Sequence, residues 1–238
     1  MGIFARSVVG VDGTNWGFEA LRQTLVLAPA DAAVHAVTAL DTRPAIHTGF
    51  DAAHWVDVLA REAEESRDEA AALLGDRAGG SAEVVRGDPV SALRRVRDDD
   101  GATLLALGGR HSSRFLGILL GDTVTQLLHD ATCSVLVARP RGDDDAWSPR
   151  AIVAGSDGSA HASAAVAVAE EVADRLGGDA GVVRDAVRPV ETLVERSESA
   201  DLIVVGSRGV RGLRALGSVS ESVAHRARCS VLVVQAAA

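Results

Sequence analysis

The chain has 238 residues, of which 47% are hydrophobic and 3% aromatic, and its formal net charge is −9. Such a core is built mainly from aliphatic side chains, as in buried parallel sheets, and an acidic chain without a basic cluster argues against a nucleic-acid partner. Every basic side chain apart from histidine is arginine, which excludes a phosphate-loop lysine and a Schiff-base lysine. No apolar stretch reaches the roughly 18 residues of a membrane helix, and no signal peptide is visible, so we expect a cytoplasmic protein without membrane contact.

In the first part of the chain, short aliphatic runs alternate with amphipathic segments. The runs have the length of buried strands, and the segments repeat apolar residues at helical spacing. The predicted strands are residues 7–11, 33–40, 82–86, 103–107 and 134–138, and the predicted helices are residues 15–28, 51–74, 90–97 and 122–130. Asp88 and Pro89 have the pattern of a helix cap followed by a first-turn proline. This alternation predicts an α/β fold with an open parallel sheet and helices on both faces.

The second part of the chain repeats the first in shortened form. The aspartate of the Asp-Gly-Thr turn, Asp12, returns as Asp157, 145 residues later, whereas residues 131–137 return at 227–233, only 96 residues later. The second copy therefore lacks 49 residues, about one strand and one long helix. Its predicted strands are residues 151–155, 181–184, 202–205 and 231–234, and its predicted helices include residues 161–176 and 189–197.

The repeat predicts two tandem domains. We expect a complete domain at residues 1–140, a polar, proline-bounded linker at 141–149 and a shortened domain at 150–238. The two cysteines occupy equivalent positions at the start of aliphatic strands, which indicates small core residues and not a disulfide or a metal site.

Two motifs place polar or glycine residues after predicted strands. The first is the aspartate turn, Asp12-Gly13-Thr14 and its copy at Asp157. Ligands bind open α/β sheets at this edge, where a carboxylate accepts hydrogen bonds from a base or ribose; an Asx turn or a helix cap is the alternative explanation. The second is a glycine-rich loop that leads into a helix, as at residues 206–209 and 217–220, and such loops favour anions.

Together these motifs resemble the universal stress protein family in its tandem form. The resemblance covers nearly the whole chain. It rests on residues 11–14, 87–89, 155–159, 205–209 and 217–221 and on the two Cys-Ser-Val-Leu-Val strands. It implies a five-stranded parallel sheet of the adenine nucleotide alpha hydrolase-like kind in each domain, and ATP binding in members that carry Gly-x2-Gly-x9-Gly-Ser/Thr. It also implies pairing through the edge strands, here Cys133–Val137 and Cys229–Val234, with a homodimer as a further option.

Neither half matches the nucleotide motif. In the first half the spacing fits, but His111 replaces a glycine and Asp122 replaces the hydroxyl residue, so a fixed negative charge lies where a phosphate would bind; a bound Mg²⁺ would reverse that sign. In the second half, Gly209 and Gly217 are two residues too close, and the missing strand would have supplied one wall of the base pocket.

The family layout therefore gives a set of candidate nucleotide-binding residues that is split between the halves. In the first half they are Asp12, Gly13, Thr14, Gly108, His111, Gly121, Asp122, Thr123 and Val124, and in the second half Asp157, Gly206, Gly209, Gly217 and Ser218. The histidines and cysteines show no metal-ligand spacing, and no nucleophile elbow is present, so we expect neither a metal site nor catalytic residues.

We expect a stress-response protein that is a binding or regulatory module and not an enzyme, with no cofactor and with nucleotide binding weakened or lost. The alternative is an ATP-binding protein that uses the crevice of the first domain, with Thr123 in place of the missing hydroxyl residue. A third hypothesis is that the shortened domain covers the first, in place of the partner of a homodimer.

Overall fold

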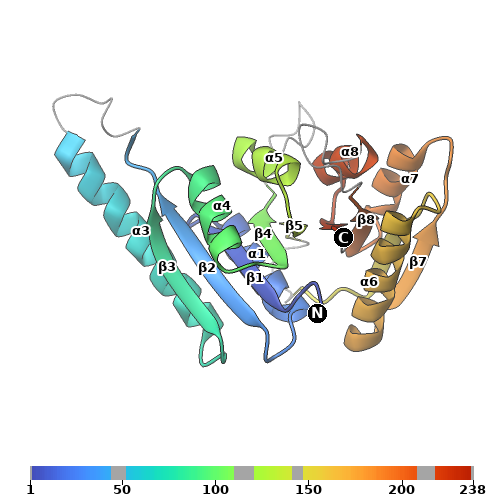
Figure 1. The fold of residues 1–238 in the computed structure, drawn as a ribbon, viewed down its shortest axis with the longest axis horizontal. Coiled ribbons are helices and arrows are strands. Elements are labelled where there is room, and N and C mark those ends of the chain that lie inside the picture. The colour runs from blue at the N-terminus through green and yellow to red at the C-terminus, as the bar shows by residue number, and fades with distance from the viewer. Residues whose placement is uncertain (1, 44–51, 110–120, 141–146, 208–217, 237–238) are drawn as a thin grey trace. The chain divides into compact units, whose positions relative to one another are not determined.

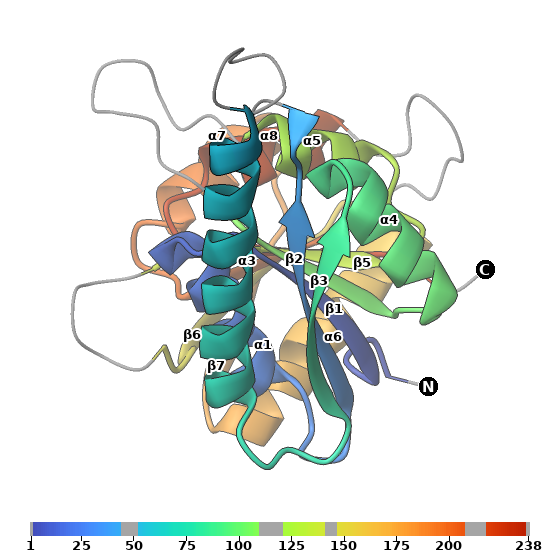
Figure 2. The same ribbon diagram turned by 90° about the vertical axis from the view of Figure 1, so that its left-hand side faces the viewer.

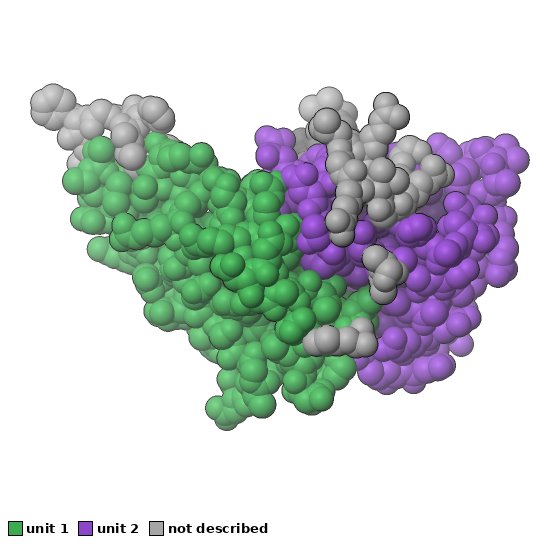
Figure 3. All heavy atoms as spheres, in the orientation of Figure 1, with its two compact units in different colours: residues 1–108 green, residues 109–238 purple. Residues whose placement is uncertain are grey.

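The computed structural model describes residues 2–43, 52–109, 121–140, 147–207 and 218–236. Strands and helices alternate along this part of the chain, as Figure 1 shows. The chain divides into two compact units, residues 1–108 and 109–238, which Figure 3 colours separately. Both units combine parallel strands with packed helices, which confirms the predicted fold class.

Among its described residues, unit 1 contains four parallel strands in the order β3-β2-β1-β4. Its elements are β1 (Arg6–Val11), α1 (Asn15–Leu27), β2 (Ala33–Leu40), α3 (Ala52–Leu74), β3 (Gly80–Arg86), α4 (Pro89–Asp99) and β4 (Leu104–Gly108). Helices α1 and α3 contact each other and the sheet, and Figure 2 shows α3 and α4 on opposite sides of β2 and β3. The core is aliphatic as expected: Val9, Leu21, Val34 and Leu104 have no exposed surface.

The part of unit 2 that the structure describes contains five strands in the order β5-β9-β8-β6-β7. Its elements are α5 (Asp122–His129), β5 (Ser134–Ala138), β6 (Ala151–Gly155), α6 (Ala160–Leu176), β7 (Asp179–Val183), α7 (Pro189–Arg196), β8 (Leu202–Gly206), α8 (Ser218–Arg226) and β9 (Ser230–Val234). Strands β6, β7, β8 and β9 run parallel, whereas β5 runs antiparallel to β9.

The shortening of the repeat is visible in the strand order. In unit 1, β1 pairs with β2, and β3 lies outside it; in unit 2, β7 pairs directly with β6 along its whole length. Helix α7 follows β7 as α4 follows β3, and both begin at a proline. The deletion therefore removed one strand and one long helix, as predicted, and the next strand in sequence fills the vacated place beside β6.

The pairing of β5 with β9 follows an internal two-fold relation. Leu136 lies opposite Leu232, which is the same repeat position 96 residues later. Val135 lies opposite Val233 and Val137 opposite Val231, so each strand meets the other as two identical copies would in an isologous contact. Strand β5 belongs to unit 2 through this pairing. The predicted domain boundary at residues 141–149 stays a prediction, because a unit of packing need not coincide with a unit of duplication.

Candidate ligand-binding site

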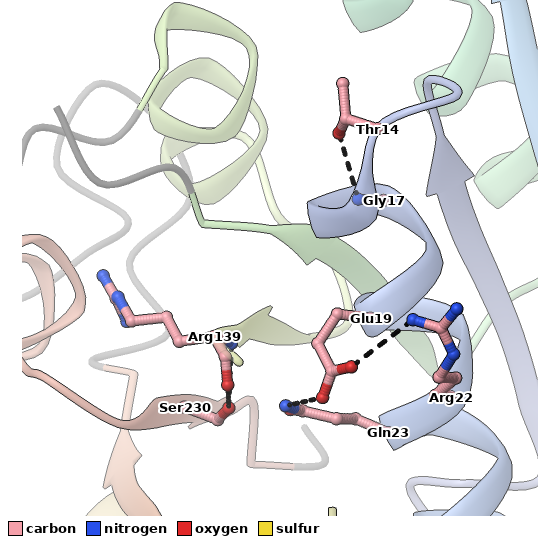
Figure 4. Close-up of polar contacts among 7 residues, drawn as sticks. All are labelled: Thr14, Gly17, Glu19, Arg22, Gln23, Arg139 and Ser230. Carbon is pink, nitrogen blue, oxygen red and sulfur yellow. Dashed lines mark hydrogen bonds and ion pairs between the residues drawn. The ribbon is translucent and has the colours of Figure 1, made fainter. Parts of the chain in front are cut away.

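The aspartate turn at the end of β1 is held by its own side chains. Asp12 Oδ1 accepts hydrogen bonds from the backbone N–H of Thr14 at 3.2 Å and from the Thr14 hydroxyl at 2.5 Å. Thr14 caps α1 by accepting from the N–H of Gly17, at 3.4 Å (Figure 4). Gly13 has φ +72°, a conformation that glycine adopts without steric cost. The turn is thus an Asx turn followed by a helix cap, in agreement with the alternative drawn from sequence.

The copy of this turn in unit 2 has the same chemistry. Asp157 Oδ1 accepts from the N–H of Ser159 at 3.0 Å, and Ser159 Oγ accepts from the N–H of Ala162 at 3.2 Å to cap α6. Gly158 has φ +81°. The local geometry therefore accounts for both Asp-Gly-Thr/Ser motifs, and the nucleotide-binding role of Asp12 and Asp157 stays a prediction.

The glycines at the ends of β4 and β8 are required by helix packing. A Cβ atom on Gly108 would collide with the carbonyl oxygen of Trp16, and one on Gly206 would lie 2.5 Å from the carbonyl oxygen of His161. Trp16 and His161 are equivalent repeat positions in the first turns of α1 and α6. Close approach between a strand end and a helix start therefore accounts for these glycines without a bound phosphate.

The remaining candidates lie at or before two helix starts. Gly121 precedes α5 without a side-chain cap, exposed Asp122 opens the helix, Thr123 is half-buried and Val124 is buried. A carboxylate at this position stabilises the helix dipole. Ser218 is the first residue of α8. His111, Gly209 and Gly217 lie outside the described residues, so the role of the two glycine-rich loops stays a prediction.

A cavity of about 480 Å³ lies beside the aspartate turn of unit 1. It is formed by the turn, the end of β2 and one face of α3. Its lining residues are Asp12, Gly13, Thr14, Thr38, Ala39, Leu40, Asp41, Leu59, Glu62, Ala63, Glu65, Ser66 and Glu69. Among these described lining residues five are acidic and none is basic, which makes the cavity a poor environment for an anion.

Four of these carboxylates, Asp41, Glu62, Glu65 and Glu69, were not singled out from the sequence. Glu62, Glu65 and Glu69 belong to a helix face that the pattern of mixed charges assigned to solvent. Their spacing of three and four residues does place them on one side of α3, but only the packing of Ala63 and Ser66 against the sheet directs that side toward the turn.

One carboxylate of the cavity is paired with an arginine. Asp41 accepts three hydrogen bonds from Arg43, at 2.8 Å from Nε, at 2.6 Å from Nη2 and at 3.0 Å from the backbone N–H. These bonds hold the pKa of Asp41 below its ordinary value. Because the Arg43 side chain is 65% exposed, this pair offsets only part of the negative charge around the cavity.

Unit 2 has a smaller cavity, of about 310 Å³, at the carboxyl ends of β6, β7 and β8. Apolar side chains from the strands and α7, such as Val183, Leu193 and Val205, form part of its lining. The other lining residues are Gly155, Ser156, Asp157, Ser159, His161, Ala162, Asp185, Ala186, Pro189, Gly206, Val219 and Ser220. The expectation that the missing strand deprives this pocket of a wall is wrong, because β7 and the loop after it take the place of that strand.

Asp185 holds the loop that forms this wall. Its Oδ1 accepts from the N–H groups of Val187 at 2.8 Å and Arg188 at 2.9 Å, and its Oδ2 accepts from the Thr192 hydroxyl at 2.7 Å. These bonds, the Arg188 N–H first, lower the pKa of Asp185. In unit 1, Asp88 caps α4 as predicted by accepting from the N–H of Ser91 at 3.0 Å, whereas the residue before Pro189 in unit 2 is Arg188, which makes no side-chain cap bond.

Asp185 was not identified from the sequence. Its signal is an aspartate four residues before the helix-opening proline, and this spacing differs from the Gly-Asp-Pro pattern of the first half. Only the hydrogen bonds of the folded loop show that Asp185 holds it.

Two absences bear on other classes of function. Within the described ranges, no cluster of three or more histidine, cysteine or acidic side chains has a geometry suited to a metal ion. Over the same part of the chain, no helix combines the length and apolar character needed to cross a bilayer.

Comparison with known proteins supplies the remaining finding. Residues 4–139 and 180–235 match the model of the universal stress protein family. Universal stress protein Rv2623 of Mycobacterium tuberculosis is 30% identical over 205 residues, which cover 64% of this chain and 67% of that protein. A universal stress protein structure from Archaeoglobus fulgidus aligns over 97% of this chain and 98% of its own, with a TM-score of 0.74 and 22% identity. A structure from Pseudomonas aeruginosa aligns over 97% and 93%, with a TM-score of 0.65 and 13% identity.

Proposed function

The chain belongs to the universal stress protein family, and from that premise we propose that it is a binding and regulatory module in which nucleotide binding by the first half is weakened or lost. One observation favours binding over catalysis. The polar groups at the strand ends, Asp12, Thr14, Asp157 and Ser159, close turns and cap helices. We also propose a cytoplasmic location, since Cys133 and Cys229 are buried and do not form a disulfide among the described residues.

The acidic lining of the unit 1 cavity carries the proposal. An anionic group bound in this cavity would lie near Glu62, Glu65 and Glu69, and two unit charges about 4 Å apart repel by about 1–4 kcal/mol between aqueous and surface-like dielectric constants. In the family motif, Asp122 likewise puts an acidic residue at the position of the hydroxyl residue that contacts phosphate. Repulsion of this size removes about one to three orders of magnitude of affinity.

Isothermal titration with Mg-ATP tests the proposal. We expect no saturable heat at micromolar concentrations from the unmodified protein, and stronger binding when Glu62, Glu65 and Glu69 are together changed to Gln. Glu64→Gln is the matched control, because Glu64 lies on α3, pairs with Arg67 at 2.8 Å and does not line the cavity. Stoichiometric micromolar binding that Asp12→Ala abolishes would instead establish the alternative, an ATP-binding protein that uses the first domain together with Gly108, Gly121 and Thr123.

The unit 2 cavity favours a second candidate function, binding of a small molecule at the ends of β6, β7 and β8. Its apolar part suits a flat or aliphatic group, and Ser156, Ser159 and Ser220 line it with hydroxyl groups that can meet polar substituents. Adenosine and AMP are the probes that the family suggests.

A blocking substitution tests this second candidate. Ala186→Trp on the exposed loop should fill the cavity and eliminate binding, whereas Val187→Trp should leave it unchanged, because Val187 is 87% exposed and does not line the cavity. If Ala186→Trp still gives heat of binding, the ligand binds elsewhere. The same variant also distinguishes heat that comes from binding to unit 2 from heat that comes from binding to unit 1.

A further inference from the structure

Two histidines occupy equivalent places on the helices that precede β5 and β9. His129 is the last residue of α5, and His225 lies in the last turn of α8, 96 positions later. The two-fold relation between the paired strands therefore also relates these histidines. Histidine is the side chain whose charge changes near neutral pH, so this part of unit 2 holds two such groups.

Only one of the two histidines has an acidic neighbour on the opposite helix. His129 Nε2 on α5 lies 3.1 Å from Glu221 Oε1 on α8. The repeat counterpart of Glu221 is Thr125 on α5. The place on α5 that would supply His225 with an equivalent carboxylate therefore holds a neutral hydroxyl group.

A buried cation lies at the same helix end as His225. Arg139, directly after β5, has no exposed surface, and its guanidinium donates to the carbonyl oxygens of Ala224 and, at 3.2 Å, of Cys229. Burial lowers the pKa of Arg139 to about 10, so the group is a cation at neutral pH. A cation stabilises a helix C-terminus. The end of α8 therefore already carries a positive charge before His225 binds a proton.

The surroundings of His225 disfavour its protonated form. Burial is the main cause that lowers its pKa, Arg139 and His129 lower it further, and Glu221 raises it. Among the described residues that act on His225, two are thus basic and one is acidic. We call His129, His225, Glu221 and Arg139 the α5–α8 cluster.

The other charged groups near the end of α8 lie in solvent or have partners of their own. Arg226 Nη1 lies 3.5 Å from Glu191 Oε1 on α7, and Arg228 Nε lies 3.1 Å from Glu198 Oε1. Asp130, at the end of α5, is exposed. Among the described residues, the α5–α8 cluster therefore depends on one carboxylate to balance its cations.

Acid adds charge that this carboxylate does not balance. When both histidines are protonated, three cations of the cluster share one carboxylate. The contact is fully stable above about pH 6.5, where histidine is neutral in an open form, and it weakens as the pH falls because the open form binds the proton more readily. We propose that the α5–α8 cluster is a pH-sensitive switch, in which protonation of His225 loosens the last turn of α8 from Arg139 and exposes the start of β9 while the rest of unit 2 stays folded.

The competing explanation is that protonation of His225 lowers the stability of unit 2 as a whole. A local opening and a global unfolding differ in which buried positions become accessible to a reagent. An experiment must therefore compare a position at the start of β9 with a buried position outside the cluster.

The native thiol of Cys229 reports the local opening. Cys229 is 2% exposed at the start of β9, and its carbonyl oxygen accepts from Arg139. In a Cys133→Ala background it is the one cysteine of the chain. Its accessibility is the rate of reaction with a dipyridyl disulfide, divided by the rate for the urea-unfolded chain at the same pH. The second reporter is Val168→Cys, on buried α6 surface, in a chain without the two native cysteines.

We expect the accessibility of Cys229 to rise about tenfold between about pH 7.5 and about pH 5.5, and that of the thiol at position 168 to stay unchanged. His225→Gln should abolish the rise at Cys229. The matched control is His161→Gln, because His161 lies in the first turn of α6 and outside the cluster. Glu221→Gln should enlarge the rise, since it removes the carboxylate that favours protonated His225 in the closed form.

Three results would overturn the proposal. They are an accessibility of Cys229 that does not change with pH, an equal rise at position 168, and a rise that persists in His225→Gln. If His225→Gln does not fold, Glu221→Gln decides: a rise no larger than that of His161→Gln would show that the charges of the cluster do not control the opening.

Discussion

The carbonyl oxygen of His161 lies so close to Gly206 that a Cβ atom on this glycine would be 2.5 Å from it. Trp16 stands in the same relation to Gly108 in unit 1. In both halves, a strand end and a helix start meet through backbone atoms, and a side chain at the glycine would force them apart. The duplicated unit therefore preserves a packing contact at positions that also belong to the family's ligand motif.

This contact predicts that Gly206→Ala destabilises the fold. The methyl group would displace the first turn of α6, and overpacking of this kind costs about 1–3 kcal/mol. Urea unfolding measures the loss. Gly121→Ala is the control, because a Cβ there meets nothing within 4 Å and the residue has φ −62°. Equal unfolding free energies for the two variants would contradict the packing role of Gly206.

Gly158 permits a separate prediction about backbone conformation. Its φ of +81° strains any residue with a Cβ, although a side chain there would have open space. Gly158→Ala should therefore lower the free energy of unfolding by about 1–2 kcal/mol. Gly158→Asn should cost less, because asparagine tolerates the left-handed region. The two variants differ in polarity, but a Cβ atom clashes with nothing in either. An equal loss of unfolding free energy in both would therefore show that backbone strain is not the cause.

Asp185 should make the stability of unit 2 depend on pH in the acid range. Its hydrogen bonds lower its pKa in the folded state below the ordinary value of an aspartate, so the folded protein favours the ionised form. This stabilisation is fully present above about pH 4 and is lost as the pH falls through the lowered pKa. Asp185→Asn should flatten the acid limb of a plot of unfolding midpoint against pH. Asp174→Asn, on the exposed face of α6, should leave that limb as it is.

His225 should make the stability of the protein depend on pH near neutrality, and here the cause is burial of the side chain and not hydrogen bonding. Burial lowers its pKa below the ordinary value of a histidine, with further lowering by Arg139 and His129 and an opposing effect of Glu221. The folded state therefore disfavours the protonated form. The stabilisation is fully present above about pH 6.5 and is lost as the pH falls toward the lowered pKa, where the unfolded chain binds the proton more readily.

His225→Gln should remove this dependence. Thermal unfolding between about pH 5 and 7 should then show a shallower slope than that of the unmodified protein, whereas His54→Gln, at an exposed position on α3, should keep the original slope. A slope that persists in His225→Gln would assign the effect to another group.

The sequence by itself determined the fold class, the repeat and the size of its deletion, because each rests on local information. Hydrophobic periodicity placed the strands and helices, and Asp88-Pro89 marked the start of α4 through a cap that the structure contains. The two offsets of the repeat showed that one strand and one helix were missing, and the strand order of unit 2 agrees.

Only the tertiary structure decided which strand takes the place of the deleted one and which residues surround the predicted site. Strand β7 follows the sequence pattern of β3 yet occupies the position of β2. A strand that is hydrogen-bonded to β6 stabilises the sheet, whereas a missing strand would leave the edge of β6 unpaired. Glu62, Glu65 and Glu69 face the Asp12 turn, and Arg139 reaches the end of α8, through contacts between segments far apart in the chain. Such contacts depend on packing, which periodicity and spacing do not encode.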